Sequence, residues 1–272
     1  MRPRDVRGVL CEFECGYQFA GSGVMLELER CVLGSDYGAT SWTSRLEADR
    51  VAGLLALDSD VRLLDVGAGS GWPAVYFARI SGCDVTLSDI PLSGLQAARA
   101  RASTDGLGAR CRVVAADGGR LPFADRSFDA VSHSDVLCCM PQKQSMLEEC
   151  RRVVHAGSRM VFSVIALAQS IEGPLRQVAR ESGPTFVECE DYAVLLDRSR
   201  WHLLERMDLA GDFAIALRAR IGGIHARYAS IEQVRGPQWI CDTLERLNAS
   251  LSAVERGLLR REAFCAVASE SN

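Results

Sequence analysis

A glycine-rich turn directly after a short apolar run is the feature that most constrains the fold. Together the apolar run and the turn have the sequence Leu63-Leu64-Asp65-Val66-Gly67-Ala68-Gly69-Ser70-Gly71, and a helical pattern follows them. Glycines let the backbone turn sharply and approach a ligand closely, while the N-terminus of a helix adds oriented N–H groups. The segment therefore predicts a strand, a turn and a helix, with a ligand bound at the carboxyl edge of a sheet.

The rest of the chain alternates between short apolar runs and helical patterns. We expect strands at 61–66, 84–88, 112–116, 130–132, 159–165, 201–209 and 258–268, and helices at 45–57, 73–80, 92–105, 143–154, 191–200, 212–228 and 238–250. Strand–helix alternation is typical of a parallel sheet covered on both faces by helices. The predicted fold class is α/β, doubly wound.

Two segments fall outside this alternation. Residues 1–44, with a helical stretch at 25–33, are expected to form an N-terminal cap on a main domain at 45–272. Residues 170–200 contain two Gly-Pro pairs and are expected to form an insert that covers the binding site and can act as a lid.

Composition excludes several classes of function. Of the 272 residues, 48% are hydrophobic and 24% charged, and the formal net charge is -4 at pH 7, which argues for a folded globule without a nucleic-acid partner. The longest apolar stretch, 160–168, is about half of the ~20 residues that span a bilayer, so we expect a cytoplasmic protein without a membrane partner. Lys143 is the single lysine, which suggests a bacterial source. The cysteines are scattered without zinc-site spacing, and we expect no metal.

Acidic residues end the second, third and fourth expected strands. Asp89 can accept hydrogen bonds from a ribose diol. Asp117 precedes a glycine turn, and the fourth strand ends in His133-Ser134-Asp135. Because the carboxyl ends of parallel strands meet at one edge, these side chains should gather around the glycine turn.

In this order and spacing the motifs resemble those of class I S-adenosylmethionine-dependent methyltransferases of the small-molecule type, such as quinone, sterol and phosphobase enzymes. The resemblance extends over residues 45–168 and includes Leu121-Pro122-Phe123, Phe128-Asp129-Ala130-Val131 and Glu149-Cys150-Arg151-Arg152-Val153. It implies a Rossmann-like, seven-stranded, mostly parallel sheet with an antiparallel last strand. It also implies methyl transfer from S-adenosylmethionine to an N or O atom of a small molecule, with S-adenosylhomocysteine as product.

The resemblance also implies cofactor-binding roles for residues along this edge. The methionine part would lie on Asp65, Gly67, Ala68, Gly69 and Gly71. Asp89 would bind the ribose hydroxyls and Ile90 would pack on the adenine. Asp117 and Gly118 would bind the adenine edge, while His133 and Ser134 would face the methionine end.

Three residues are candidates for catalysis. Tyr37 lies in a segment that loosely resembles a cap whose tyrosine approaches the methyl group, although a packed aromatic fits equally well. Asp135 resembles an acid near the acceptor amine in phosphobase enzymes. Cys138 and Cys139 stand where many relatives carry a histidine, which leaves His133 as the nearest base or, alternatively, as a structural residue. Candidate acceptor contacts are Trp42, Trp201, His225 and Tyr228, each of which could instead be structural.

Other functions remain open at this point. A regulatory subunit could bind S-adenosylmethionine without turnover. A nicotinamide-dependent oxidoreductase is disfavoured, because the third glycine of G-x-G-x-x-G would fall at Trp72. The adjacent thiols of Cys138 and Cys139 could bind a soft metalloid, with core packing as the default. We expect a monomer or a homodimer.

Overall fold

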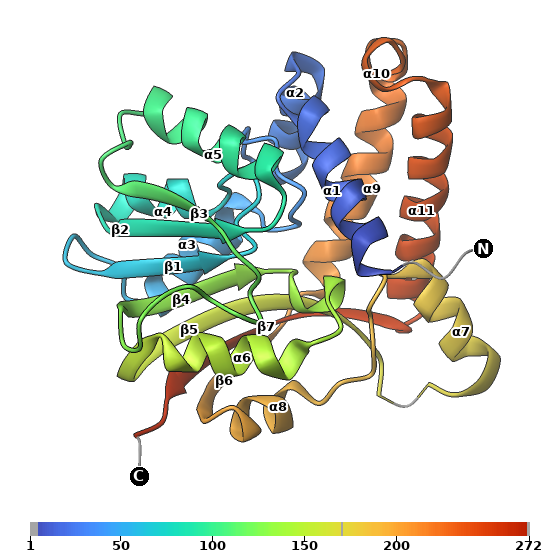
Figure 1. Cartoon of the computed structure of the whole chain (residues 1–272). Coiled ribbons are helices and arrows are strands. Elements are labelled where there is room, and N and C mark those ends of the chain that lie inside the picture. Colours follow the sequence, from blue (N-terminus) through green and yellow to red (C-terminus); the bar gives the residue numbers. More distant parts are fainter. Residues whose placement is uncertain (1–4, 170, 271–272) are drawn as a thin grey trace.

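One seven-stranded sheet organises the part of the chain that the computed structural model describes, residues 5–169 and 171–270 (Figure 1). Its strands are β1 (Arg62–Val66), β2 (Asp84–Asp89), β3 (Cys111–Ala115), β4 (Phe128–Ser134), β5 (Val154–Leu167), β6 (Trp201–Asp208) and β7 (Leu259–Ala268). Their order is β3-β2-β1-β4-β5-β7-β6, and the last strand, β7, is antiparallel to both of its neighbours. The predicted doubly wound α/β fold is confirmed.

Helices cover both faces of the sheet. One face carries α3 (Arg45–Leu54), α4 (Ala74–Ser81) and α5 (Leu92–Thr104), and the other carries α6 (Lys143–Arg152) and α8 (Tyr192–Arg198). Successive residues of a strand point to opposite faces of the sheet. Leu63 packs on the side of α3, α4 and α5, and Leu64 packs on the side of α6 and α8. This alternation follows from the two-residue period of a strand and explains why the central strands are apolar throughout.

A helical layer lies over the carboxyl edge of the sheet (Figure 1). It combines helices from both ends of the chain: α1 (Val6–Ala20), α2 (Gly23–Leu33), α9 (Ala210–Ala226), α10 (Tyr228–Arg235) and α11 (Pro237–Glu255). Helices α2 and α11 both pack on α9. The cap is therefore built jointly by both ends of the chain, while the division into domains at residue 44 stays a prediction.

Sequence analysis did not predict helix α1. Asp5 begins it by accepting a hydrogen bond from the Gly8 N–H at 2.7 Å, and Val9 and Tyr17 are buried. Helix α7 (Gly173–Ser182) was also not predicted; it lies in the expected insert and packs on α11 and β5. Ser170, at the start of that insert, lies outside the described residues. No helix among the described residues has both the length and the apolar character to cross a bilayer.

A buried arginine on β7 ties the edge of the sheet to α3. Arg261 is 1% exposed and donates to the Glu47 carboxylate at 2.8 and 2.9 Å. On its other side it donates to Asp135, just after β4, at 3.0 to 3.2 Å, and to the Ser163 hydroxyl at 3.0 Å. Burial raises the pKa of Glu47, which the Arg261 charge opposes. One cation is thus shared by two largely buried carboxylates.

Replacing this cation should destabilise the fold. In Arg261→Leu both carboxylates lose their partner, and we expect the free energy of unfolding at pH 7 to fall by about 3–5 kcal/mol. The loss should shrink toward pH 5, because a carboxyl whose pKa is raised in the folded state is more easily accommodated when protonated. Urea unfolding at both pH values measures this.

A matched control is Arg50→Leu, which removes the exposed Arg50–Glu205 pair between α3 and β6. That change should cost under about 1 kcal/mol. A loss at Arg261 no larger than the loss at Arg50 would contradict the assignment of Arg261 as the compensating charge.

Candidate active site

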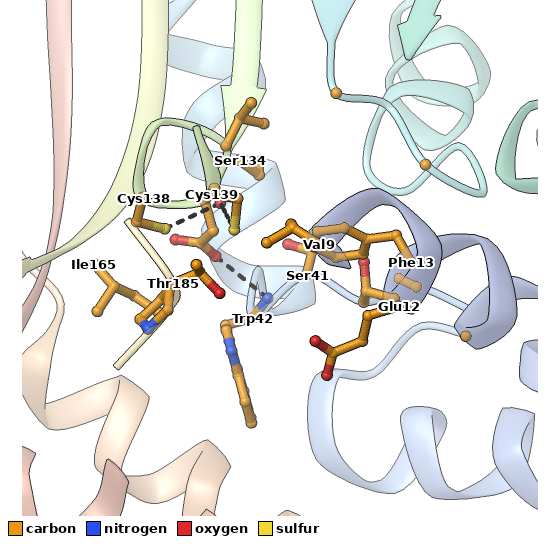
Figure 2. Close-up of a pocket in the computed structure, with 18 of the residues that line it drawn as sticks. Val9, Glu12, Phe13, Ser41, Trp42, Ser134, Cys138, Cys139, Ile165 and Thr185 are labelled. Carbon is orange, nitrogen blue, oxygen red and sulfur yellow. Dashed lines mark hydrogen bonds between the residues drawn. The ribbon is translucent and has the colours of Figure 1, made fainter. Parts of the chain in front are cut away.

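A cavity of about 940 Å³ lies between the carboxyl edge of the sheet and the helical layer. Figure 2 shows Val9 and Phe13 of α1 on one side of it and Cys138 and Ile165 on the other, with Trp42 between them. The residues that follow β1, β2, β3 and β4 form its floor. The cavity is therefore at the edge where the sequence predicts ligand binding.

The glycine turn after β1 has a backbone that only glycine accommodates. Gly67 and Gly69 have φ of 73° and 53°. A Cβ on Gly67 would lie 2.4 Å from a methyl of Val136, and one on Gly69 would lie 2.2 Å from the Tyr17 hydroxyl. The N–H groups of Gly67 and Ala68 donate to the Ser88 carbonyl at 2.7 and 3.1 Å. The turn is held against the end of β2 and lines the cavity.

Gly71 has a different role. It does not line the cavity, and a Cβ there would lie 2.8 Å from Val75 and 3.1 Å from Ala98. Its lack of a side chain lets the turn and α4 pack closely on α5. The contact that sequence analysis expected between Gly71 and the cofactor is thus replaced by a packing role.

Two acids with raised pKa values flank the turn. Asp65 is 2% exposed and accepts a hydrogen bond from the Ser132 hydroxyl at 2.5 Å. Burial raises the pKa of Asp65 to about 7. Asp89 accepts from the N–H groups of Gly69 and Ile90, both at 2.7 Å. Burial raises the pKa of Asp89 to about 6, although these hydrogen bonds favour the ionised form.

The segment after β3 completes this end of the cavity. Asp117 is exposed and accepts from the Gly119 N–H at 2.9 Å. Gly118 sits close to β1, since a Cβ there would lie 3.0 Å from a methyl of Val66. Asp117, Gly118 and the 40% exposed Ile90 all line the cavity, together with Asp89. An exposed apolar side chain between two acids suits a ligand with a flat ring and hydroxyl groups.

His133 is not placed as sequence analysis expected. It is 1% exposed, stacks on Phe162 with ring centroids 4.6 Å apart, and is absent from the cavity wall. Burial lowers the pKa of His133 to about 3, and neither ring nitrogen has a hydrogen-bond partner among the described residues. Strand residues alternate between faces, so the next residue, Ser134, reaches the cavity instead. The geometry does not support His133 as a base or a cofactor contact.

Tyr37 is also kept away from the cavity. Its ring packs on Trp72 at 5.2 Å between centroids, with the Arg101 guanidinium 4.0 Å from the Tyr37 centroid. Tyr17 of α1 approaches the glycine turn in its place, and its hydroxyl is hydrogen-bonded to the Thr40 hydroxyl at 3.0 Å. Burial and the Asp89 charge raise the pKa of Tyr17, so the hydroxyl stays protonated. The sequence does contain a signal for α1: Asp5 is a residue that can begin a helix, and apolar residues follow it at helical spacing.

Asp135 does line the cavity, but its carboxylate is already engaged. Besides the Arg261 pair, Asp135 accepts from the Trp42 N–H at 3.4 Å and from the Ser163 hydroxyl at 3.2 Å. Its carbonyl accepts from the Cys138 and Cys139 thiols at 3.1 and 3.5 Å (Figure 2). Asp135 also has a φ of 57°, a strained conformation for a residue with a side chain.

Of the four predicted acceptor contacts, the structure brings only Trp42 to the cavity, where its ring meets Phe213 edge-on at 5.1 Å. Trp201 is 2% exposed, and its indole N–H donates to the Leu147 carbonyl at 3.0 Å inside the core. His225 and Tyr228 are exposed outside the cavity wall. No three His, Cys, Asp or Glu side chains of the described residues converge as a metal site would require.

Comparison with known proteins agrees with this geometry. Residues 64–162 match the methyltransferase domain family. The 27-O-demethylrifamycin SV methyltransferase of Amycolatopsis mediterranei is 35% identical over 168 residues, which cover 60% of this chain and 59% of that protein. The 24-methylenesterol C-methyltransferase 2 of Oryza sativa is 28% identical over 238 residues, which cover 79% of this chain and 63% of that protein. The chain spans less than two thirds of the length of either relative.

A solved structure shows the same fold. The phosphoethanolamine N-methyltransferase 2 of Haemonchus contortus, in complex with S-adenosylmethionine, superposes with a TM-score of 0.74 at 14% identity, covering 98% of this chain and 58% of that one. The family match, the curated relatives and the fold agree with the motif order along the sheet. These matches support a class I S-adenosylmethionine-dependent methyltransferase domain of the small-molecule type at residues 64–162.

Proposed function

We propose that this chain transfers the methyl group of S-adenosylmethionine to an N or O atom of a small molecule. The observation that carries the proposal is that the glycine turn, Asp89 and Asp117 all open into one cavity, which continues beneath the helical layer. A volume of about 940 Å³ is at the upper end of ordinary ligand sites and leaves space for an acceptor beside the cofactor.

The residues along the edge fit the parts of the cofactor. Each oxygen of Asp89 accepts one backbone N–H, and a carboxylate has about four acceptor sites, so lone pairs remain for both ribose hydroxyls. Ile90 offers an apolar surface for the adenine, and Asp117 a carboxylate at its edge. The turn from Gly67 to Gly69 lets the backbone approach the methionine part of the cofactor. Asp65 and Ser134 line the same cavity.

The bound cofactor supplies an already activated methyl group, so the chain's own task is alignment and exclusion of water. Tyr17 encloses the cavity over the glycine turn, and Trp42 encloses it beside Asp135. Because the Asp135 carboxylate is engaged by Arg261 and by the Trp42 N–H, this residue is better suited to positioning the loop than to removing a proton. An acceptor oxygen or nitrogen would then lose its proton to water or to a group of its own.

The choice of an N or O atom has support from a relative named for O-methylation, while another relative is named for C-methylation. We also infer that the protein acts in the cytoplasm as a monomer or homodimer, without a nucleic-acid or membrane partner. The net charge of -4 supports the absence of a nucleic-acid partner. A silent regulatory subunit and a nicotinamide-dependent enzyme are the alternatives that the following measurements separate.

Removing the ribose acid should weaken cofactor binding. In Asp89→Ala we expect the affinity for S-adenosylhomocysteine to fall about tenfold to hundredfold, because charge-assisted hydrogen bonds to the ribose are lost. Isothermal titration with S-adenosylmethionine, S-adenosylhomocysteine and NAD measures this. Asp84→Ala is the control, since Asp84 begins the same strand at the opposite edge and is 61% exposed. Unchanged affinity in Asp89→Ala would remove the ribose assignment, and binding of NAD alone would overturn the function.

Cofactor affinity should depend on pH through Asp89. The pKa of Asp89 is about 6 in the free protein, so this carboxylate binds a proton below pH 6. The proton then competes with the ribose hydroxyls for the carboxylate. We expect constant affinity above pH 7 and a fall approaching roughly tenfold per pH unit well below 6. Asp89→Asn should abolish this dependence, while any contribution from Asp65, whose pKa lies near 7, should remain. An identical pH profile in Asp89→Asn would show that another group titrates.

Turnover separates the enzyme from a silent subunit. Incubation of the protein and S-adenosylmethionine with amines, phenols and hydroxylated or carboxylated apolar compounds, followed by mass spectrometry and NMR, should give a product methylated on N or O. A methyl group found on carbon would correct the proposed atom. Cofactor binding without any product would favour the regulatory subunit.

A further inference from the structure

The arginines of the cavity wall differ in whether a carboxylate pairs with them. Arg180, Arg220, Arg235 and Arg246 all line the cavity. Arg180 pairs with Glu188, and Arg246 pairs with Glu12. Within residues 5–169 and 171–270, neither Arg220 nor Arg235 forms an ion pair. The cavity wall therefore contains two arginines that no carboxylate of the described residues contacts.

Arg220 of α9 is the more deeply placed of the two. Its guanidinium lies 5.3 Å from the Trp42 ring centroid, and burial lowers its pKa. Glu29 of α2 is an acid whose charge reaches Arg220, but it does not pair with it. A partly buried cation without an ion-pair partner is costly, and an incoming anion would relieve that cost.

The Glu29 carboxylate is fully used within the cap. One oxygen accepts from the Ser35 hydroxyl at 2.6 Å and the Tyr37 N–H at 3.0 Å. The other accepts from the N–H groups of Gly38 and Ala39 at 2.6 and 3.0 Å. These hydrogen bonds fix the loop that leads to Trp42, and they leave the Arg220 guanidinium without a carboxylate in contact with it.

Arg235 of α10 is backed by aromatic rings. Its guanidinium lies 4.6 Å from the Phe19 centroid and 4.4 Å from the Trp239 centroid, and its pKa is also lowered by burial. Stacking on rings holds a guanidinium in place while its N–H groups stay available for a carboxylate or phosphate. Both unpaired arginines of the wall have this aromatic support.

The wall around these cations is apolar. Met25, Leu28, Phe213 and Leu247 line this part of the cavity together with Trp42. Trp42 links it to the methyl-transfer end, because its backbone N–H donates to Asp135. A ligand here meets an apolar surface along its body and a positive charge at its end.

We propose that the methyl acceptor is an apolar molecule with an anionic oxygen group, a carboxylate or a phosphate, and that Arg220 binds this group with Arg235 in support. The proposal rests on the methyltransferase function above and specifies its substrate class. The methionine carboxylate of the cofactor is a competing anion for Arg220, so the test must separate the two.

The test uses octanoate, octyl phosphate and octanol as matched probes, titrated calorimetrically into the full chain saturated with S-adenosylhomocysteine. We expect at least one anionic probe to bind at least tenfold more tightly than octanol, as charge-assisted hydrogen bonds imply. Arg220→Gln should abolish this preference and leave S-adenosylhomocysteine affinity within about twofold. The two anionic probes distinguish carboxylate from phosphate.

Arg218→Gln is the control, because Arg218 lies on the same helix, is 54% exposed and pairs with Glu255. It should behave as wild type. If Arg220→Gln does not fold, Arg220→Lys keeps the charge without the planar fork and should give an intermediate preference.

Three results would overturn the proposal: no anionic probe binds the wild type tenfold more tightly than octanol, the preference survives in Arg220→Gln, or that variant loses S-adenosylhomocysteine affinity tenfold. The last would assign Arg220 to the cofactor. If the wild type binds no S-adenosylhomocysteine, the methyltransferase proposal fails instead, and the same probe series on the unliganded chain still tests the anion site.

Discussion

The hydrogen bond from the Gly69 N–H to the Asp89 carboxylate is the interaction on which the site depends. It joins the turn after β1 to the end of β2, and the N–H groups of Gly67 and Ala68 join the same strand through the Ser88 carbonyl. Burial opposes the charge on Asp89, while the backbone donors favour it. The carboxylate that we assign to the ribose therefore also shapes the turn beneath the methionine part, and the two functions cannot vary independently.

The sheet and the cofactor edge are predictable from sequence for a physical reason. Central strands buried on both faces must be apolar runs, and acids that stand directly after them fall at one edge because the strands are parallel. Asp65, Asp89 and Asp117 are brought together by topology alone, without any knowledge of side-chain packing. Arg261 and Glu47 could not be foreseen, since their pairing joins residues 214 positions apart.

The acceptor end is less predictable because it depends on which face a residue takes and on which segments pack together. Strand β4 is buried from Ala130 to His133, so composition does not reveal that His133 points into the core and Ser134 into the cavity. The same limit applies to the cap, where sequence analysis named Tyr37 and the structure places Tyr17 at the cavity. Only the docking of α1 onto α5 places Tyr17 over the glycine turn.

The electrostatics of the cavity favour some acceptors over others. The Asp135 carboxylate shares the Arg261 charge with Glu47, and O–H and N–H donors already occupy both oxygens of Glu29, so neither carboxylate offers an open site for pairing with a cation. Among the described residues, Arg220 has no ion-pair partner and lies beside Trp42. A protonated amine would meet this positive charge without a free carboxylate to balance it, whereas an uncharged or anionic molecule would not. This distribution of charge therefore favours an acceptor hydroxyl or a neutral nitrogen on an acidic apolar molecule over a cationic amine.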